Sequence, residues 1–170
     1  MAELCDLTNV AEGTIFYHFK NKEELFLITL EKLKDDIIGE FETYMCNNEF
    51  KSGLHMMEAA ISFYFYLANE MEDRFLLFHR HDAYELAKAN TTCRDHLEAI
   101  YDCLVDIFER CIVVGQKDGS IGDMSARKVA LIIFSMVDGL VRLDTYNLYD
   151  PSTLYDELIA SCRRLLQNST

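Results

Sequence analysis

The chain has 170 residues, of which 50% are hydrophobic, and a formal net charge of −13. A chain of this length buries enough surface for one core, or for one core with a small appended module. The negative charge argues against non-specific binding of nucleic acid, so any DNA-binding function has to rest on a local motif. One proline and seven glycines favour long helices over a turn-rich sheet, and we expect an all-α fold.

Helical periodicity begins with two short predicted helices over residues 3–8 and 11–19. Asn21 and Glu24 then form a capping signature that starts a long helix ending near Met45. Asp150 and Pro151 mark another start, because aspartate caps a helix and proline fits its first turn. Further helices are predicted over residues 54–69, 73–89, 93–114, 126–148 and 151–166, with a glycine-containing loop over residues 115–122.

Six cysteines form no CxxC pair, which is typical of a protein in a reducing compartment. We see no secretory leader at the start of the sequence. The longest apolar runs, such as residues 61–68, are too short to cross a bilayer. We therefore expect a cytoplasmic protein without a membrane segment.

Residues 4–19 have the pattern of a helix-turn-helix, whose second helix enters the major groove of DNA. Four apolar residues are spaced to join its two helices: Leu4, Val10, Ile15 and Phe19. The residues expected to face DNA are Gly13, Thr14, Tyr17 and His18. Lys20 and Lys22 lie where the next helix begins, and there an ammonium and a helix N-terminus can hold a phosphate together. An ordinary αα corner is the alternative interpretation.

Residues 10–25 read Val-Ala-Glu-Gly-Thr-Ile-Phe-Tyr-His-Phe-Lys-Asn-Lys-Glu-Glu-Leu without a gap. This segment resembles the signature of the tetracycline-repressor (TetR) family of bacterial transcription regulators. The resemblance implies DNA contacts by Thr14, Phe16, Tyr17, His18 and Lys22, with Thr14 and Lys22 serving phosphates. It also implies operator DNA as a partner and a protein that is not an enzyme and has no cofactor.

Three features depart from that family pattern. Phe16 replaces a more usual tyrosine, and Asn9 stands where the family usually has glycine. The family places a whole helix and a basic arm before this point, so we expect an N-terminally truncated head with a partial helix-turn-helix. Residues 1–50 also carry four lysines against eleven acidic residues, which disfavours DNA binding by this form.

The remaining residues are rich in aromatic side chains, and residues 61–68 are apolar on all sides of a helix. Aromatic walls with a few polar groups are typical of a small-molecule pocket, so we expect an effector that is partly apolar or aromatic. The predicted pocket residues are Phe63, Tyr66, Phe78, His81, Tyr101 and Met136. A well-packed core without a ligand is the alternative.

His79, Arg80, His81 and Asp82 form the densest polar cluster of the sequence. Alternate residues of a helix point about 200° apart, so His79 and His81 are poorly placed to share a metal, and we expect surface histidines. A polar contribution of His79 or His81 to a pocket is the alternative. Cys93 and His96 lack a third ligand, and we predict no metal site. An acid/base pair of His79 with Asp82 would suit an enzyme, but no catalytic motif accompanies it.

The last two predicted helices, 126–148 and 151–166, carry broad apolar faces. In the TetR family the corresponding helices form a four-helix bundle between two subunits, so the resemblance implies a homodimer. A larger monomeric core is the alternative. Gly139 within the first of these helices suggests a close helix crossing.

The sequence therefore predicts a partial DNA-binding head with its connecting helix over residues 1–45. A ligand-binding and dimerisation domain is expected over residues 46–170. The function that fits both is a ligand-responsive regulator, a repressor released by a small molecule. A dimerising ligand-binding module without DNA-binding activity is the second interpretation.

Overall fold

The computed structural model describes residues 21–167, and in this range it contains seven α-helices, one short 3₁₀ helix and no strand. The predicted all-α fold is confirmed. The elements are α3 (Lys22–Asn47), α4 (Gly53–Glu70), α5 (Glu72–His79), α6 (His81–Ala89), α7 (Thr91–Asp118), α8 (Ala126–Thr145), η1 (Pro151–Leu154) and α9 (Tyr155–Leu166).

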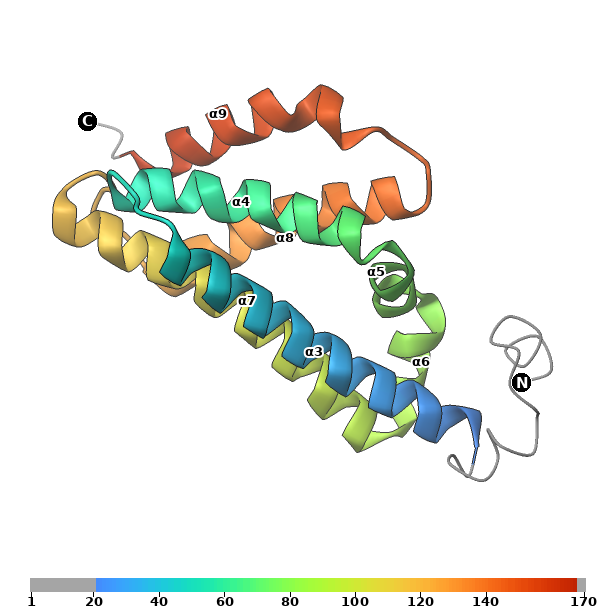
Figure 1. Ribbon diagram of the computed structural model, residues 1–170. Coiled ribbons are helices and arrows are strands. Elements are labelled where there is room, and N and C mark those ends of the chain that lie inside the picture. Colours follow the sequence, from blue (N-terminus) through green and yellow to red (C-terminus); the bar gives the residue numbers. More distant parts are fainter. Residues whose placement is uncertain (1–20, 168–170) are drawn as a thin grey trace.

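Helix α7 is the central element, because it packs against α3, α4, α6 and α8. Figure 1 shows α3 running alongside α7, with α5 and α6 near one end of the bundle and α9 near α4 and α8. The core between these helices is aromatic, and its largest fully buried side chains include Tyr64, Phe41, Phe75, Phe78 and Phe108. Burial of such side chains supplies most of the driving force for packing the helices together.

Two helix starts follow directly from local side-chain chemistry. The backbone N–H of Glu24 donates to Asn21 Oδ1 at 2.8 Å, which confirms the predicted cap of α3. Helix α7 begins with the same device two residues before the predicted start, since Cys93 N–H donates to Asn90 Oδ1 at 3.0 Å.

The single helix predicted over residues 73–89 is wrong. The chain breaks at Arg80, whose backbone is extended at φ −65° and ψ 139° and separates α5 from α6. The break turns His79 inward, where it is buried, while His81 stays exposed. The prediction of two surface histidines is therefore wrong for His79.

The loop predicted to open at Gly115 is also displaced. Helix α7 continues to Asp118, and Gly119 ends it in the left-handed conformation at φ 79°. Gly115 instead lies buried where α4 crosses α7, and a Cβ built on Gly53 would lie 2.0 Å from Gly115 N. Two glycines thus allow the backbones of the helices to approach closely. Gly139, expected at a crossing, has no atom of residues 21–167 within 4 Å of a built Cβ.

The last two helices are shorter than predicted. Helix α8 ends at Thr145, and Asn147 follows with a positive φ of 53°. Asp150 caps the next element as expected, accepting from Ser152 N–H at 2.9 Å, but the first turn is 3₁₀ and α9 begins at Tyr155. No helix among residues 21–167 is long and apolar enough to span a membrane.

Candidate functional site

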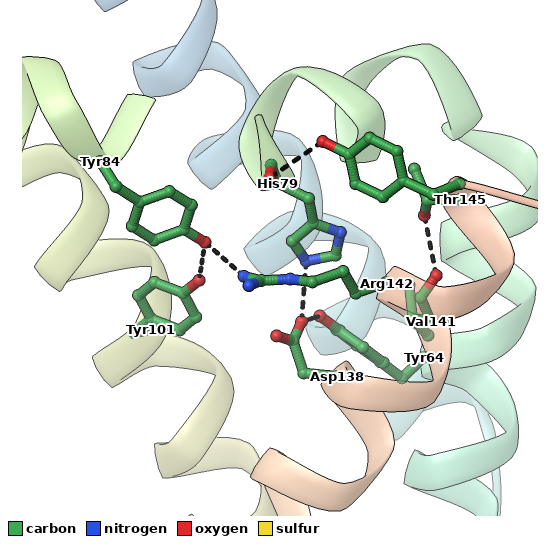
Figure 2. A network of polar contacts seen from close by, with 9 residues as sticks. Tyr64, His79, Tyr84, Tyr101, Asp138, Val141, Arg142 and Thr145 are labelled. Atoms are coloured by element: carbon green, nitrogen blue, oxygen red, sulfur yellow. Dashed lines mark hydrogen bonds and ion pairs between the residues drawn. The ribbon is translucent and has the colours of Figure 1, made fainter. Parts of the chain in front are cut away.

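The carboxylate of Asp138 lies in the apolar interior of the bundle, on the inner face of α8. The Tyr64 hydroxyl of α4 donates to its Oδ1 at 2.7 Å, and His79 Nε2 of α5 lies 3.0 Å from the same oxygen. Figure 2 shows the three side chains meeting. A buried carboxylate is tolerated only when it is paired in this way, so Asp138 ties three helices to one point.

Burial, and then the neighbouring Asp138, raise the pKa of Tyr64 well above its usual value. The Tyr64 hydroxyl therefore stays protonated and acts as a donor to the carboxylate. When His79 is neutral, a hydrogen bond to Asp138 fixes its proton on Nε2 and leaves Nδ1 as an acceptor.

A second polar group lies beside the first, between α6, α7 and α8. One Nη of Arg142 donates to the Tyr84 hydroxyl at 2.6 Å, and that hydroxyl lies 2.5 Å from the hydroxyl of Tyr101. The guanidinium also lies over the ring of Tyr84, 5.4 Å from its centroid. Burial and the Tyr84 hydroxyl raise the pKa of Tyr101, so this phenol also remains protonated.

Two buried nitrogen atoms of this site have no hydrogen-bond partner among residues 21–167: His79 Nδ1 and Arg142 Nε. Buried polar atoms are nearly always paired, because an unmade hydrogen bond costs the desolvation of the group. Two such atoms among aromatic side chains mark this region as a candidate binding site.

Of the predicted pocket residues, Phe78 and Tyr101 lie at this network, with ring centroids 5.0 Å apart. Met136 is half-buried against the same core. Phe63 instead stacks on Tyr44 at 4.0 Å, between α3 and α4. Tyr66 is 54% exposed.

His81 points to solvent, with its side chain 81% exposed. Asp82 pairs with Arg80 at 2.6 Å rather than with His79, so the acid/base pair considered from the sequence does not form. The structure therefore brings together only some of the predicted pocket residues.

The predicted pocket left out five residues of the network: Tyr64, His79, Tyr84, Asp138 and Arg142. One signal was present, because Asp138 interrupts the apolar stripe of α8. An acidic residue on a buried helix face needs a partner and marks a place to search.

The N-terminal end of α3 faces the break between α5 and α6 across a groove. A groove of about 340 Å³ separates α3 from the α5–α6 break, and its lining includes Lys22, Phe26, Leu77, Arg80 and Leu86. The side-chain amide of Asn90 also donates to Glu23 in the first turn of α3. The start of α3 is therefore tied to the junction of α6 and α7, next to the helix that carries Tyr84.

Lys22 is exposed in the first turn of α3, where the sequence placed a phosphate contact. The other predicted DNA-binding residues, Gly13, Thr14, Phe16, Tyr17 and His18, lie outside the described residues. Among residues 21–167, no three His, Cys, Asp or Glu side chains are grouped to hold a metal ion.

Residues 1–28 match the family model described as "Bacterial regulatory proteins, tetR family". The match covers the segment that carried the sequence resemblance, residues 10–25. A comparison with curated proteins gives no match.

The fold is similar to that of a solved transcriptional regulator, FadR from Bacillus subtilis in complex with stearoyl-CoA. The two chains share 20% identity and a TM-score of 0.73, over 97% of this chain and 86% of the other. The chain is therefore similar to the TetR family in its first 28 residues and to FadR in its fold.

Proposed function

We propose that the chain is a ligand-responsive regulator whose effector binds at the network around Asp138 and Arg142. The observation that carries this proposal is the pair of unpartnered nitrogens, His79 Nδ1 and Arg142 Nε, within an aromatic core. A ligand that forms hydrogen bonds with those two atoms offsets the free-energy cost of their desolvation. Repression that is released by the ligand is the proposed mode of action.

Helix α3 is the proposed link between the effector site and the DNA-binding head. Residues 1–45 form the proposed head with its connecting helix, and residues 46–170 form the ligand-binding and dimerisation domain. The inner face of α3, with Leu30, Leu33 and Ile37, packs into the common core. An effector changes DNA affinity only if it binds one arrangement of α3 better than the other.

The effector is expected to have an apolar body, because aromatic rings surround the network. Phe78 lies 5.0 Å from Tyr101, and Phe134 lies 5.8 Å from Tyr101. The similar Bacillus subtilis regulator was solved with stearoyl-CoA, so a long-chain acyl compound is a reasonable first probe. The core of the present chain supports the same broad class of ligand.

A homodimer through α8 and α9 is proposed from the apolar side chains that these helices leave exposed. Leu131 and Ile132 of α8 are 53% and 50% exposed, and Leu165 of α9 is 42% exposed. Gly139 is exposed on α8, and a Cβ built there meets no atom of the described residues within 4 Å, so a second helix can approach closely.

Light scattering tests the dimer. We expect Ile132→Glu to give monomers, because a charge at the centre of an interface loses its hydration. Ile28→Glu is the matched control, since Ile28 is 46% exposed on α3. Equal masses for the two variants would count against this interface.

DNA binding is tested by fluorescence anisotropy with the DNA upstream of the gene for this chain. We expect Lys22→Ala to weaken binding and to flatten its salt dependence, because one phosphate contact is lost. Lys51→Ala removes an exposed charge away from the head and should leave binding unchanged. Stearoyl-CoA is then added to the wild-type complex, and release of the DNA is the expected result. A complex that persists with every effector tested would contradict ligand-released repression.

A further inference from the structure

We propose that the effector site recognises an oxyanion headgroup, carboxylate or phosphate, on an amphipathic ligand, and that Arg142 is its primary contact. This inference rests on the proposed function, because it assigns a ligand class to the same site. The guanidinium of Arg142 is half-buried, and its only hydrogen bond among residues 21–167 is to the Tyr84 hydroxyl.

Arg142 follows Asp138 by four residues on α8, which is the spacing at which acid and base pair across a helix turn. The two side chains nevertheless face different partners. Asp138 is engaged by Tyr64 and His79, and Arg142 forms no ion pair with any carboxylate of residues 21–167. A half-buried cation next to a carboxylate that is already occupied can accept a second anion.

The remaining contacts of Arg142 suit an oxyanion better than a neutral group. Its Nε is buried and unpartnered, whereas one Nη is held by Tyr84. A planar guanidinium presents neighbouring N–H groups that match two oxygens of a carboxylate or phosphate. The protonated hydroxyls of Tyr84 and Tyr101 can donate to the same headgroup.

Entry of a headgroup between α6 and α8 is compatible with how α6 is held. Helix α6 spans nine residues, and Ala83 is the only one of them that is fully buried. Tyr84 and Arg142 are half-buried rather than enclosed. A small outward movement of α6 would therefore separate Tyr84 from Arg142 at limited cost in buried apolar surface.

The first test compares three ligands that share one alkyl chain: dodecanoate, dodecyl phosphate and dodecanol. Binding to the full chain is measured by calorimetry, which suits a protein without tryptophan. We expect at least one anionic ligand to bind about tenfold or more tightly than dodecanol, as for a charge-assisted hydrogen bond. The tighter of the two anions distinguishes a carboxylate from a phosphate ligand. Equal affinity for all three, or no binding by either anion, overturns the proposal.

The second test uses variants. Arg142→Gln should lower the affinity for the anions to that for dodecanol, and Arg142→Lys should restore part of the difference. Lys117→Gln is the control, because it removes an exposed positive charge from the far end of α7. Tyr84→Phe keeps the ring and should weaken anion binding several-fold, so the idea stays testable if Arg142→Gln does not fold. Unchanged anion binding by Arg142→Gln or by Tyr84→Phe overturns the assignment.

Failure of this inference is distinguishable from failure of the proposed function. If the anions do not bind but another effector releases DNA, the headgroup assignment is wrong and the regulator remains. If wild-type chain does not bind the upstream DNA, the regulatory function fails, while the ligand comparison still decides the role of Arg142.

Discussion

The crossing of α4 and α7 predicts that a glycine-to-alanine substitution lowers stability at Gly53, although the same substitution raises stability at an open helical position. A Cβ built on Gly53 would lie 2.0 Å from Gly115 N, 2.3 Å from Gly115 Cα and 2.8 Å from the carbonyl oxygen of Cys111. All three are backbone atoms and cannot swing aside as the end of a side chain does. Gly53→Ala therefore has to push the start of α4 away from α7.

Overpacking of this kind costs about 1–3 kcal/mol, and the rigid neighbours place Gly53→Ala at the upper end. The displacement also stretches the hydrogen bond from Gly53 N–H to Asp118 Oδ2, which is 2.6 Å long. For a chain of this size each kcal/mol lowers Tm by roughly 2–4 °C, so we expect a fall of roughly 5–10 °C.

The matched control is Gly39→Ala. A Cβ on Gly39 meets no atom within 4 Å, and the position is exposed within α3. The same chemical change there should stabilise the chain by about 0.5–1 kcal/mol, because alanine favours the helix. Thermal unfolding followed by circular dichroism measures both variants. The reasoning is refuted if Gly53→Ala melts at or above the temperature of Gly39→Ala.

Three further predictions concern the core, the pH dependence and the cysteines. Tyr64→Phe should destabilise by about 1–3 kcal/mol in urea unfolding, because Asp138 loses a buried donor, whereas Tyr66→Phe on the exposed side should change little. Hydrogen bonds from Ser120 and from Gly53 N–H lower the pKa of Asp118. The ionised Asp118 carboxylate therefore stabilises the fold above about pH 4, and this stabilisation is lost in more acidic solution. As the pH is lowered, Tm should fall less steeply for Asp118→Asn than for the wild type. If Tm falls equally steeply for both proteins below about pH 4, Asp118 is not responsible for the acid sensitivity. Burial raises the pKa of Cys111 to about 12, whereas Cys46 is exposed, so a thiol reagent should label Cys46 first and Cys111 only on unfolding. Early labelling of Cys111 would mean that the α4–α7 packing opens in the native state.

Much of the helical layout could be predicted because its signals are local. Asn21 caps α3 and Asp150 caps the next turn, both through contacts within a few residues. The break at Arg80 was missed because no proline or glycine marks it. Gly115 was misassigned to a loop because its close partner, Gly53, lies far away in sequence.

The candidate site was harder to predict than the fold. His79 and Asp138 are separated by 59 positions in sequence, and neither residue signals the other. Aromatic composition indicated an apolar pocket, but a helical pattern alone does not show which side of a helix another helix covers. Tyr66 and His81 were therefore included among the predicted pocket residues, although both side chains are exposed to solvent.

One side chain joins the starts of the two longest helices. Asn90 accepts from Cys93 N–H at the start of α7 with its oxygen, and donates to Glu23 at the start of α3 with its nitrogen. The starts of α3 and α7 are therefore coupled through one amide, and loss of the Asn90 side chain would remove the cap of α7 and the contact to α3 together.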